Sequence, residues 1–554
     1  MRAHLASFEP LKPGEAAYCE SVATGRVDAH GRFLVGDGKL PEPGDSSRTI
    51  RAAVVEYLAR SGPPGRSGAS TGLRLAGATI VGDVALTGAR QMPDLELACC
   101  RFEGVLQLRG AELRLLDLED AHLRRIEADR LEAPGGVLMR NAKVEGEARF
   151  LGARIGGDFS AAGAHFLLPT GFALNADRID VRGDLSLNGA VVDGEARLVG
   201  ARVGGDLACL GTIFKGRELA PAESGTAAPA AGDRPVRIAL NLDRAEVAGA
   251  FFLRARDAEH PAEVHGVLDL TGARLSMIGD DKGAWPQQPH TLRLDRCRYD
   301  GFIGKGAPTD ARTRLKWLAL HDPTRLGADF HPQPYMQLAA VLRDTGHAEG
   351  ARRVLIRKER LQRRAQRRAA WRRAPVEALA RTLWDCILAW TIDYGLRPLK
   401  ALWGMLFLFL AGWAIFATAE RLDAVKPNNP FILRSAEWAF CAHPDKQIVV
   451  DASKNPTGVG RAQSPNGELE SQLDCFQRQD ESASFPRFSA LAYSADTLFP
   501  LVDLEMQDNW IPDETAAEPW GGRIRAYLWV QIALGWFLSL LAVAGLSGLV
   551  RSDK

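Results

Sequence analysis

The stretch Gly183–Phe214, GDLSLNGAVVDGEARLVGARVGGDLACLGTIF, repeats itself every 11 residues. Glycine recurs at 183, 194 and 205, leucine recurs at 187 and 198, and Cys209 takes the next leucine position. The same unit, close to L-x-L-x-G-A-x-[VI]-x-G-[DE], runs from about Leu73 to Ile303. A long coiled coil is excluded, because each interior glycine costs a helix about 1 kcal/mol.

The L-x-L alternation predicts short strands in which residues i and i+2 share a face. A small alanine at a fixed inward position and glycine at the corners are typical of a narrow parallel β-helix, with two units in each coil. The repeat resembles that of the pentapeptide-repeat β-helices, with a 5+6 spacing in place of the strict pentapeptide. This resemblance implies a right-handed parallel β-helix.

Four parts are predicted along the chain. Residues 1–70 form an N-terminal segment in which a helix at Ser47–Gly62, with Ile50, Val54, Tyr57 and Leu58 at helical spacing, caps the β-helix. Residues 71–303 form the β-helix repeat domain, with a low-complexity loop insertion at 215–235. Residues 309–397 form a basic, juxtamembrane helical neck with a helical hairpin that turns at 344–347, and residues 398–554 form the membrane region.

Tempting chemical residues inside the repeat have structural explanations. Cys100, Cys209 and Cys297 fall at inward positions, where cysteine behaves as a small hydrophobe. A row of recurring acids is expected to be a solvated face rather than a cation site: Asp83, Glu147, Asp158, Asp184, Glu195 and Asp206. The sequence has no G-x-G-x-x-G after a strand, no C-x-x-C and no haem-attachment motif. We therefore assign no catalytic, cofactor-binding or metal-ligating residue and no cofactor, and we favour a protein that is not an enzyme.

The neck is strongly basic. About fourteen Lys and Arg lie between Arg352 and Lys400, with few acids. Such a run indicates nucleic acid, anionic lipid or membrane topology, and sparse aromatic residues disfavour nucleic acid. The spacing of Leu379, Leu383 and Ile387 predicts an amphipathic helix at 378–392 that lies at the membrane interface.

Two apolar segments, at about 399–419 and 526–550, meet the requirement of roughly 20 residues for a membrane span, and the first has no charged residue after Lys400. The basic run before the first segment, together with Arg551 and Lys554 after the second, places both termini in the cytoplasm. The loop 420–521 is then external. The predicted protein is therefore two-pass, with its β-helix in the cytoplasm.

The external loop contains an amphipathic segment at 486–505, which includes FSALAYSADTLFPLVDL (Phe488–Leu504). Two spans with such a segment between them resemble the two-transmembrane ion channels, in which a pore helix leads into a filter of the type T-x-x-T-x-G-Y-G-D. Thr497 matches the threonine that opens this pattern, Asp503 matches the acid that closes it, and Pro500 favours a turn of the chain between them. The intervening LFPLV has no glycine, so potassium selectivity is not implied. A re-entrant pore lining and an interfacial helix over the spans both stay open.

Three motifs, DYGLRPLKALW (Asp393–Trp403), AYSADTLFPLVDL (Ala492–Leu504) and LGWFLSLLAVAGLSGLVR (Leu534–Arg551), resemble those of a set of bacterial membrane proteins with a repeat solenoid. The resemblance implies the bacterial inner membrane. Members are often labelled membrane-associated oxidoreductases, for which this sequence offers only the pairs Cys99–Cys100 and Cys441–Cys475.

The predicted fold is mainly β in the N-terminal half, a right-handed parallel β-helix, followed by an α-helical neck and a two-helix transmembrane region. Three functional hypotheses follow: a membrane-anchored interaction or sensing scaffold, a channel-like ion-conducting protein, and a membrane-associated oxidoreductase. The expected partners are the lipid membrane, a protein that binds the β-helix, and further copies of the chain in a homo-oligomer. Nucleic acid is not expected.

Cys441 and Cys475 are the two cysteines of the external loop, so we predict that they form a disulfide in an oxidising compartment. Mass spectrometry of the non-reduced protein should find the two cysteine peptides linked. Two free thiols at these positions would overturn the topology or the compartment.

Overall fold

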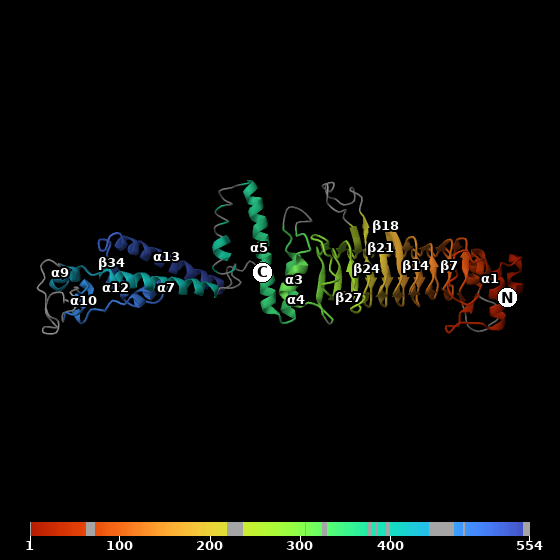
Figure 1. Cartoon of the computed structure of the whole chain (residues 1–554), viewed down its shortest axis with the longest axis horizontal. Coiled ribbons are helices and arrows are strands. Elements are labelled where there is room, and N and C mark those ends of the chain that lie inside the picture. Colours follow the sequence, from red (N-terminus) through yellow and green to blue (C-terminus); the bar gives the residue numbers. More distant parts are fainter. Residues whose placement is uncertain are drawn as a thin grey trace. The chain divides into compact units, whose positions relative to one another are not determined.

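Figure 1 shows the computed structural model of the chain, which forms two compact units, Met1–Ala365 and Gln366–Lys554. The structure describes residues 2–61, 72–218, 237–304, 306–323, 330–373, 379, 382, 385–389, 391, 393, 399–442, 470–479 and 482–546. Most of the predicted insertion at 215–235 lies outside these residues, as do Arg551 and Lys554, and the predicted helix at 378–392 is described only in part.

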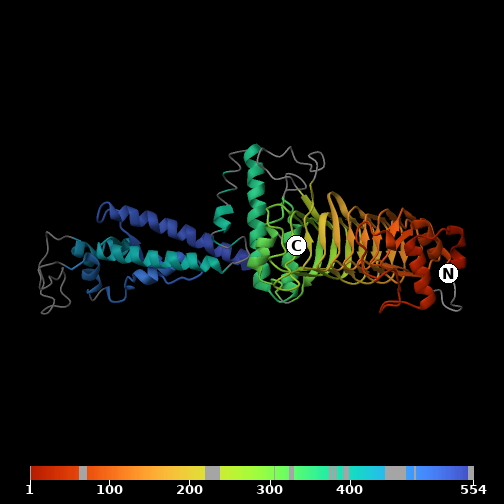
Figure 2. The same cartoon turned by 45° about the vertical axis from the view of Figure 1, so that its right-hand side comes forward.

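Short parallel strands, stacked coil upon coil, build most of the first unit (Figures 1 and 2). Leu73 pairs with Leu95 and Leu185 pairs with Leu207, each 22 positions apart, whereas Phe159 and Leu185 lie 26 positions apart. Two 11-residue units therefore make one coil, and about nine coils are described. The parallel β-helix that the repeat predicts is confirmed.

The coils contribute to two sheets. One contains β1 (Phe33–Leu34), β3 (Leu73–Ala76), β6 (Leu95–Ala98), β9 (Leu116–Asp117), β12 (Glu132–Ala133), β13 (Val137–Leu138), β16 (Arg154–Ile155), β17 (Phe159–Ser160), β19 (Asp180–Val181), β20 (Leu185–Ser186), β22 (Arg202–Val203), β23 (Leu207–Leu210), β27 (Glu246–Arg254), β30 (Arg274–Asp280) and β32 (Arg298–Phe302). The other contains β2 (Thr49–Arg51), β4 (Thr79–Val81), β5 (Val84–Ala85), β7 (Arg101–Phe102), β8 (Val105–Gln107), β10 (His122–Leu123), β11 (Arg125–Glu127), β14 (Lys143–Val144), β15 (Ala148–Arg149), β18 (His165–Asn175), β21 (Val191–Arg197), β24 (Ile213–Phe214), β25 (Arg217–Glu218), β26 (Arg237–Asn241), β28 (Glu263–Val264), β29 (Val267–Asp269) and β31 (Leu292–Arg293).

The core is a continuous column of inward side chains, and Leu187, Leu198 and Ala190 are fully buried within it. Cys100, Cys209 and Cys297 are buried in the same column, as the repeat predicts. A column this narrow accepts only small residues beside large ones, because protein interiors pack at nearly crystalline density.

One corner of the coil carries a ladder of aspartates. The Oδ1 atom of Asp158 accepts the backbone N–H of Asp184 (2.9 Å), and Asp184 accepts that of Asp206 (2.8 Å) in the same way. Glycine precedes each later step because a Cβ at Gly205 would overlap the Asp184 carboxylate. Asp158 and Asp184 are exposed, in agreement with the predicted solvated row, and they also cap the backbone of the next coil. Glu195 is fully buried, so the prediction of a solvated acid is wrong at that position.

The N-terminal cap is shorter than the predicted Ser47–Gly62 helix. Helix α2 begins at Ala52 and ends at Ser61, and η2 (Ser46–Arg48) precedes the strand β2. Ile50 lies in β2, where it pairs with Ile80, instead of on the helix. The exposed edge of the first coil pairs with Thr49–Arg51 because its backbone N–H and C=O groups need hydrogen-bond partners. Helices η1 (Arg2–Phe8) and α1 (Pro13–Thr24) complete this end.

At the other end of the β-helix, two glutamine side chains of the neck donate hydrogen bonds to backbone carbonyl groups at the last strand. The side chains of Gln333 and Gln337, one turn apart on α4 (Gln333–Asp344), donate to the carbonyl oxygens of Cys297 (2.8 Å) and Tyr299 (2.6 Å). These alternate carbonyls lie along β32 and its approach, so the helix takes the place of a further coil. The open edge is thus closed without another strand.

A buried arginine holds the preceding helix, α3 (Ala311–Leu318), against the same end. Arg314 is fully buried and donates two hydrogen bonds of 2.7 Å to Asp280, with a third to the carbonyl of Pro308 (2.6 Å). Its guanidinium carbon lies 3.5 Å from the ring centre of Phe302. Both side chains are buried, so removing either one leaves the charge of the other buried without compensation, which is destabilising.

The neck continues with α5 (Ala348–Arg373), which begins three residues after the Thr345 turn. The predicted helical hairpin at 344–347 therefore matches the observed boundary of α4 and α5. The second unit contains α7 (Lys400–Arg421), β33 (Val425–Pro427), α8 (Pro430–Leu433), α9 (Ala436–Ala442), α10 (Gln472–Gln477), α11 (Ala490–Leu498), α12 (Met506–Asn509), β34 (Trp510–Pro512) and α13 (Trp520–Leu546).

We predict that Arg314→Met destabilises the C-terminal end of the β-helix by about 3–5 kcal/mol, because Asp280 remains buried without a charged partner, although the Nε1–H of Trp285 still donates to it (2.8 Å). Arg312→Met is the matched control, since Arg312 is exposed on the same helix. Hydrogen exchange of the β30 and β32 amides in the full-length protein should rise in the first variant only. Equal exchange in both variants would contradict the assigned role of the buried pair.

Candidate functional site

The second unit is organised around two long apolar helices. Helices α7 and α13 have mean hydropathies of 1.9 and 1.8 and are long enough to cross a membrane, and most of their residues are not buried in the protein. Their exposed side chains are large and apolar, including Trp403 and Phe407 on α7 and Trp529 and Leu540 on α13. Such an extensive apolar exterior is typical of a surface that contacts lipid.

The predicted helix in the segment 486–505 is α11, and it packs against both long helices. Its N-cap is Ser489, whose side chain accepts from the backbone N–H of Ala492. The hydroxyl of Ser494 donates to the carbonyl oxygen of Phe409 on α7 (2.8 Å). The contact is close because a Cβ at Gly412 would overlap Ser494 and Gln531, and one at Gly535 would overlap the carbonyl of Leu498.

A buried amide joins α13 to α11. The Nε2 atom of Gln531 lies 3.0 Å from the carbonyl oxygen of Ser494, 3.2 Å from its hydroxyl and 3.1 Å from the hydroxyl of Thr497. Gln531 is fully buried, and within the described residues its Oε1 atom has no hydrogen-bond partner. A buried polar group that is only partly satisfied is costly in a core and is frequently functional.

Helix α11 reaches deep between the two long helices. At 1.5 Å per residue, Gly535 lies about 22 Å from the Trp520 end of α13, and Met405 lies about 8 Å from the Lys400 end of α7. Leu498 packs with Met405 and Leu538, whereas Tyr493 packs with Phe416 near the opposite end of α7. The axis of α11 therefore runs from the Arg421 end of α7 toward its Lys400 end.

The chain then turns back without forming a helix. We name Phe499–Glu505 the return segment. Asp496 anchors it, because its carboxylate accepts the backbone N–H of Leu504 (2.7 Å) and that of Gln507 (2.8 Å). The return segment nonetheless exposes apolar side chains, with Leu501 92% exposed.

The three residues that motif matching selects lie in different surroundings. Thr497 is buried, and its hydroxyl bonds to the carbonyl of Tyr493 (2.8 Å) as well as to Gln531. Pro500 is half-buried in the return segment, and Asp503 is exposed there and accepts the backbone N–H of Glu505. Thr497 thus lies in a helix interface, apart from the exposed Asp503.

Sequence reasoning missed Ser494, Asp496 and Gln531, which make the polar contacts of the site, and Gly412 and Gly535, which allow them. A signal was present for Gln531, a lone amide in an otherwise uncharged apolar segment. The glycines also follow the rule that small residues mark the contact faces of membrane helices.

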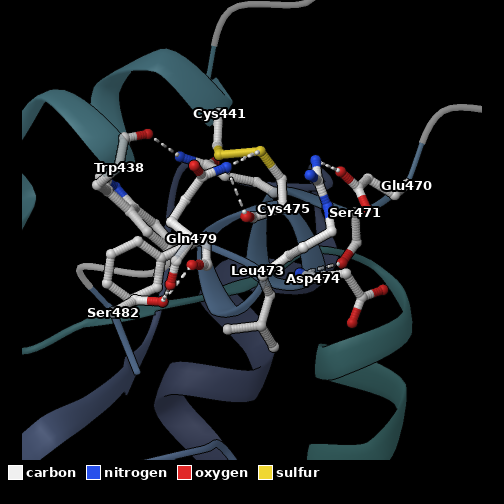
Figure 3. The surroundings of a disulfide bond; sticks show 12 residues. Trp438, Cys441, Glu470, Ser471, Leu473, Asp474, Cys475, Gln479 and Ser482 are labelled. Carbon is white, nitrogen blue, oxygen red and sulfur yellow. Dashed lines mark hydrogen bonds and ion pairs between the residues drawn. A yellow bond between two sulfur atoms is a disulfide. The ribbon is translucent and has the colours of Figure 1, made fainter. Parts of the chain in front are cut away.

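The far end of this unit is tied together by backbone and covalent contacts. Strands β33 and β34 pair antiparallel, with Val425 opposite Pro512. Cys441 and Cys475 form a disulfide that joins α9 to α10, and Figure 3 shows Gln479 beside it. The carboxylate of Asp423 accepts the backbone N–H of Gln472 at the start of α10. These contacts stabilise the part of the loop 420–521 that precedes α11 in the chain.

The described thiols of the first unit are poorly suited to redox chemistry. Burial raises the pKa of Cys100 to about 12 and that of Cys297 to about 12, and burial also raises the pKa of Cys99. A thiol with so high a pKa stays protonated and weakly nucleophilic at neutral pH. Among the described residues, no group of three or more His, Cys, Asp or Glu is arranged to hold a metal ion.

The surface of the β-helix carries a basic hollow of about 690 Å³. Arg109, Arg130, Arg149 and Arg178 line it, with Asp129 as the acidic residue of the set. Asp129 is engaged by Arg149 (2.9 Å), whereas the exposed Arg130 and Arg178 make no ion pair with a described residue. The hollow therefore has a net positive charge.

No family model, curated protein or solved structure matches this chain. The resemblances drawn from sequence motifs therefore remain proposals.

We predict that Gly535→Ala loosens α11, because the added Cβ meets the carbonyl oxygen of Leu498. Gly522→Ala is the matched control on the same helix, since nothing lies within 4 Å of a Cβ there and alanine favours a helix by about 1 kcal/mol. Hydrogen exchange of the α11 amides in detergent should rise in the first variant and stay unchanged in the second. Unchanged protection in both variants would refute the close packing.

Proposed function

We propose that this chain is a two-span protein of the bacterial inner membrane whose return segments, brought together in a homo-oligomer, line a cation pathway. Both termini and the β-helix lie in the cytoplasm in this proposal. The observation that carries it is the depth of the non-helical return segment between two apolar helices. The disulfide-containing loop then faces an oxidising compartment.

The N–H groups of Phe499, Val502 and Glu505 have partners within the chain, but among the described residues no donor reaches the carbonyl oxygens of Pro500–Leu504. Non-helical backbone at membrane depth is tolerated only where protein buries it or water reaches it. Asp496 satisfies two N–H groups at and beyond the end of the return segment, yet the side chains of Leu501, Val502 and Leu504 remain exposed. In lipid the apolar side chains would be accommodated, but the carbonyl oxygens of this segment would be left without donors. Other copies of the segment around a water-filled axis provide the missing cover.

The charges of the site favour cations. Asp503 and Glu505 are exposed on the return segment, and a ring of such acids from several subunits attracts cations. Helix α11 also directs its C-terminal end inward, where the helix dipole is negative. The glycine-free LFPLV gives no ring of carbonyl ligands, so the proposed pathway does not select potassium.

A second candidate function belongs to the β-helix, which we propose as an interaction or sensing scaffold for an anionic partner. The basic hollow around Arg130 and Arg178 supports this candidate. The two functions are compatible, because a scaffold domain on a channel-like tail is a means of regulation. The oxidoreductase hypothesis is weaker, since the buried thiols Cys100 and Cys297 are held protonated.

We predict that Leu501→Cys in the full-length protein forms disulfide crosslinks between subunits on oxidation and that, in separate reduced samples, a charged thiol reagent blocks cation flux into liposomes. Both effects follow if Leu501, 92% exposed, faces a shared axis. Asp503→Asn should lower the flux by removing one acid from each subunit.

Phe431→Cys is the matched control, because Phe431 is 87% exposed and belongs to α8 rather than to the return segment. It should neither crosslink efficiently nor confer block. A strictly monomeric protein in membranes, without flux in any of the variants, would refute the proposed pathway.

A further inference from the structure

Helix α5 separates its residues into two very different faces. Ala351 and Val354 are buried against the core of the first unit, and Leu361 packs on the same core. The opposite face is exposed and carries five arginines followed by a tryptophan: Arg353, Arg357, Arg360, Arg364, Arg368 and Trp371. We call this set the arginine stripe.

The arginine stripe is a regular feature of the helix surface. At about 100° per residue its members fall within an arc of about 80°, and at 1.5 Å per residue they extend over about 27 Å. Trp371, at the C-terminal end, is 51% exposed. The stripe is therefore a straight basic surface that ends in an exposed amphipathic ring.

Few acids neutralise this surface. Glu349 pairs with Arg353 (3.5 Å), and Glu359 pairs with Arg363 (2.7 Å), outside the stripe. No described carboxylate forms an ion pair with Arg357, Arg364 or Arg368. Arginines at a spacing of four repel one another and destabilise an isolated helix by a few tenths of a kcal/mol per pair. An anionic partner removes this repulsion.

We infer that the arginine stripe docks on anionic lipid headgroups at the cytoplasmic face of the membrane. This inference rests on the proposed membrane insertion of α7, which begins at Lys400, downstream of the stripe in the same chain. Juxtamembrane basic residues are attracted to anionic leaflets, and tryptophan prefers the headgroup level. A single-stranded nucleic acid site would interleave aromatic residues with the arginines, and the stripe has one only at its end.

A spin label at Trp371→Cys in the full-length protein tests the inference, with Cys386→Ser and Cys99→Ser removing the more accessible native thiols. In bilayers with phosphatidylglycerol we expect the label to be accessible to oxygen and shielded from a soluble nickel complex. In purely zwitterionic bilayers, or in 0.5 M salt, it should return to water, because salt screens the attraction.

The variant Arg357→Gln, Arg364→Gln, Arg368→Gln should lower the ratio of docked to undocked label on the order of 100-fold, from the attraction lost with three arginines. The control variant Arg154→Gln, Arg202→Gln, Arg274→Gln removes the same charge from exposed sites on the β-helix and should leave docking unchanged. A label that stays in water in anionic bilayers, or that added single-stranded RNA immobilises instead, would overturn the inference.

A second label at Leu406→Cys, an exposed position of α7, separates the two proposals. If this label lies in lipid and the Trp371→Cys label does not, the docking of the stripe is refuted and the membrane span stands. If the Leu406→Cys label lies in water, the proposed membrane insertion fails, and the inference fails with it.

Discussion

The structure depends above all on giving every backbone N–H and C=O group at a strand edge a partner. Within the β-helix each coil meets this need for its neighbour, which is why Leu73 and Leu95 align one coil apart. The aspartate ladder extends the same solution to the corners, where Asp184 accepts the N–H of Asp206. The last coil has no following coil to pair with. There the side chains of Gln333 and Gln337 in the neck supply hydrogen-bond donors that a further strand would have supplied.

The same constraint is stricter in the second unit. Helices α7 and α13 satisfy their own backbones, so they suit an apolar surrounding. The return segment is not helical, and Asp496 serves its end by accepting two N–H groups. What remains must be met by protein or by water. Oligomerisation and a water-filled axis are therefore two aspects of one physical requirement in the proposed assembly.

Local periodicity explains how much the sequence could predict. The 11-residue unit predicts the coil and the buried places of Cys100, Cys209 and Cys297, because those positions follow from the repeat itself. Ile50 shows the limit: its spacing from Val54 favours a helix, but the open edge beside Ile80 draws it into a strand.

The candidate site shows the same limit more sharply. Motif matching selects Thr497, yet its surroundings are set by Gln531, 34 residues later in the chain, and no local pattern encodes that contact. The return segment contains no glycine. Without glycine its carbonyls cannot form a ring of ligands, so the exposed Leu501 and the acids Asp503 and Glu505 would face an ion instead. A pathway lined in this way distinguishes cations from anions, but it has no means of distinguishing potassium from sodium.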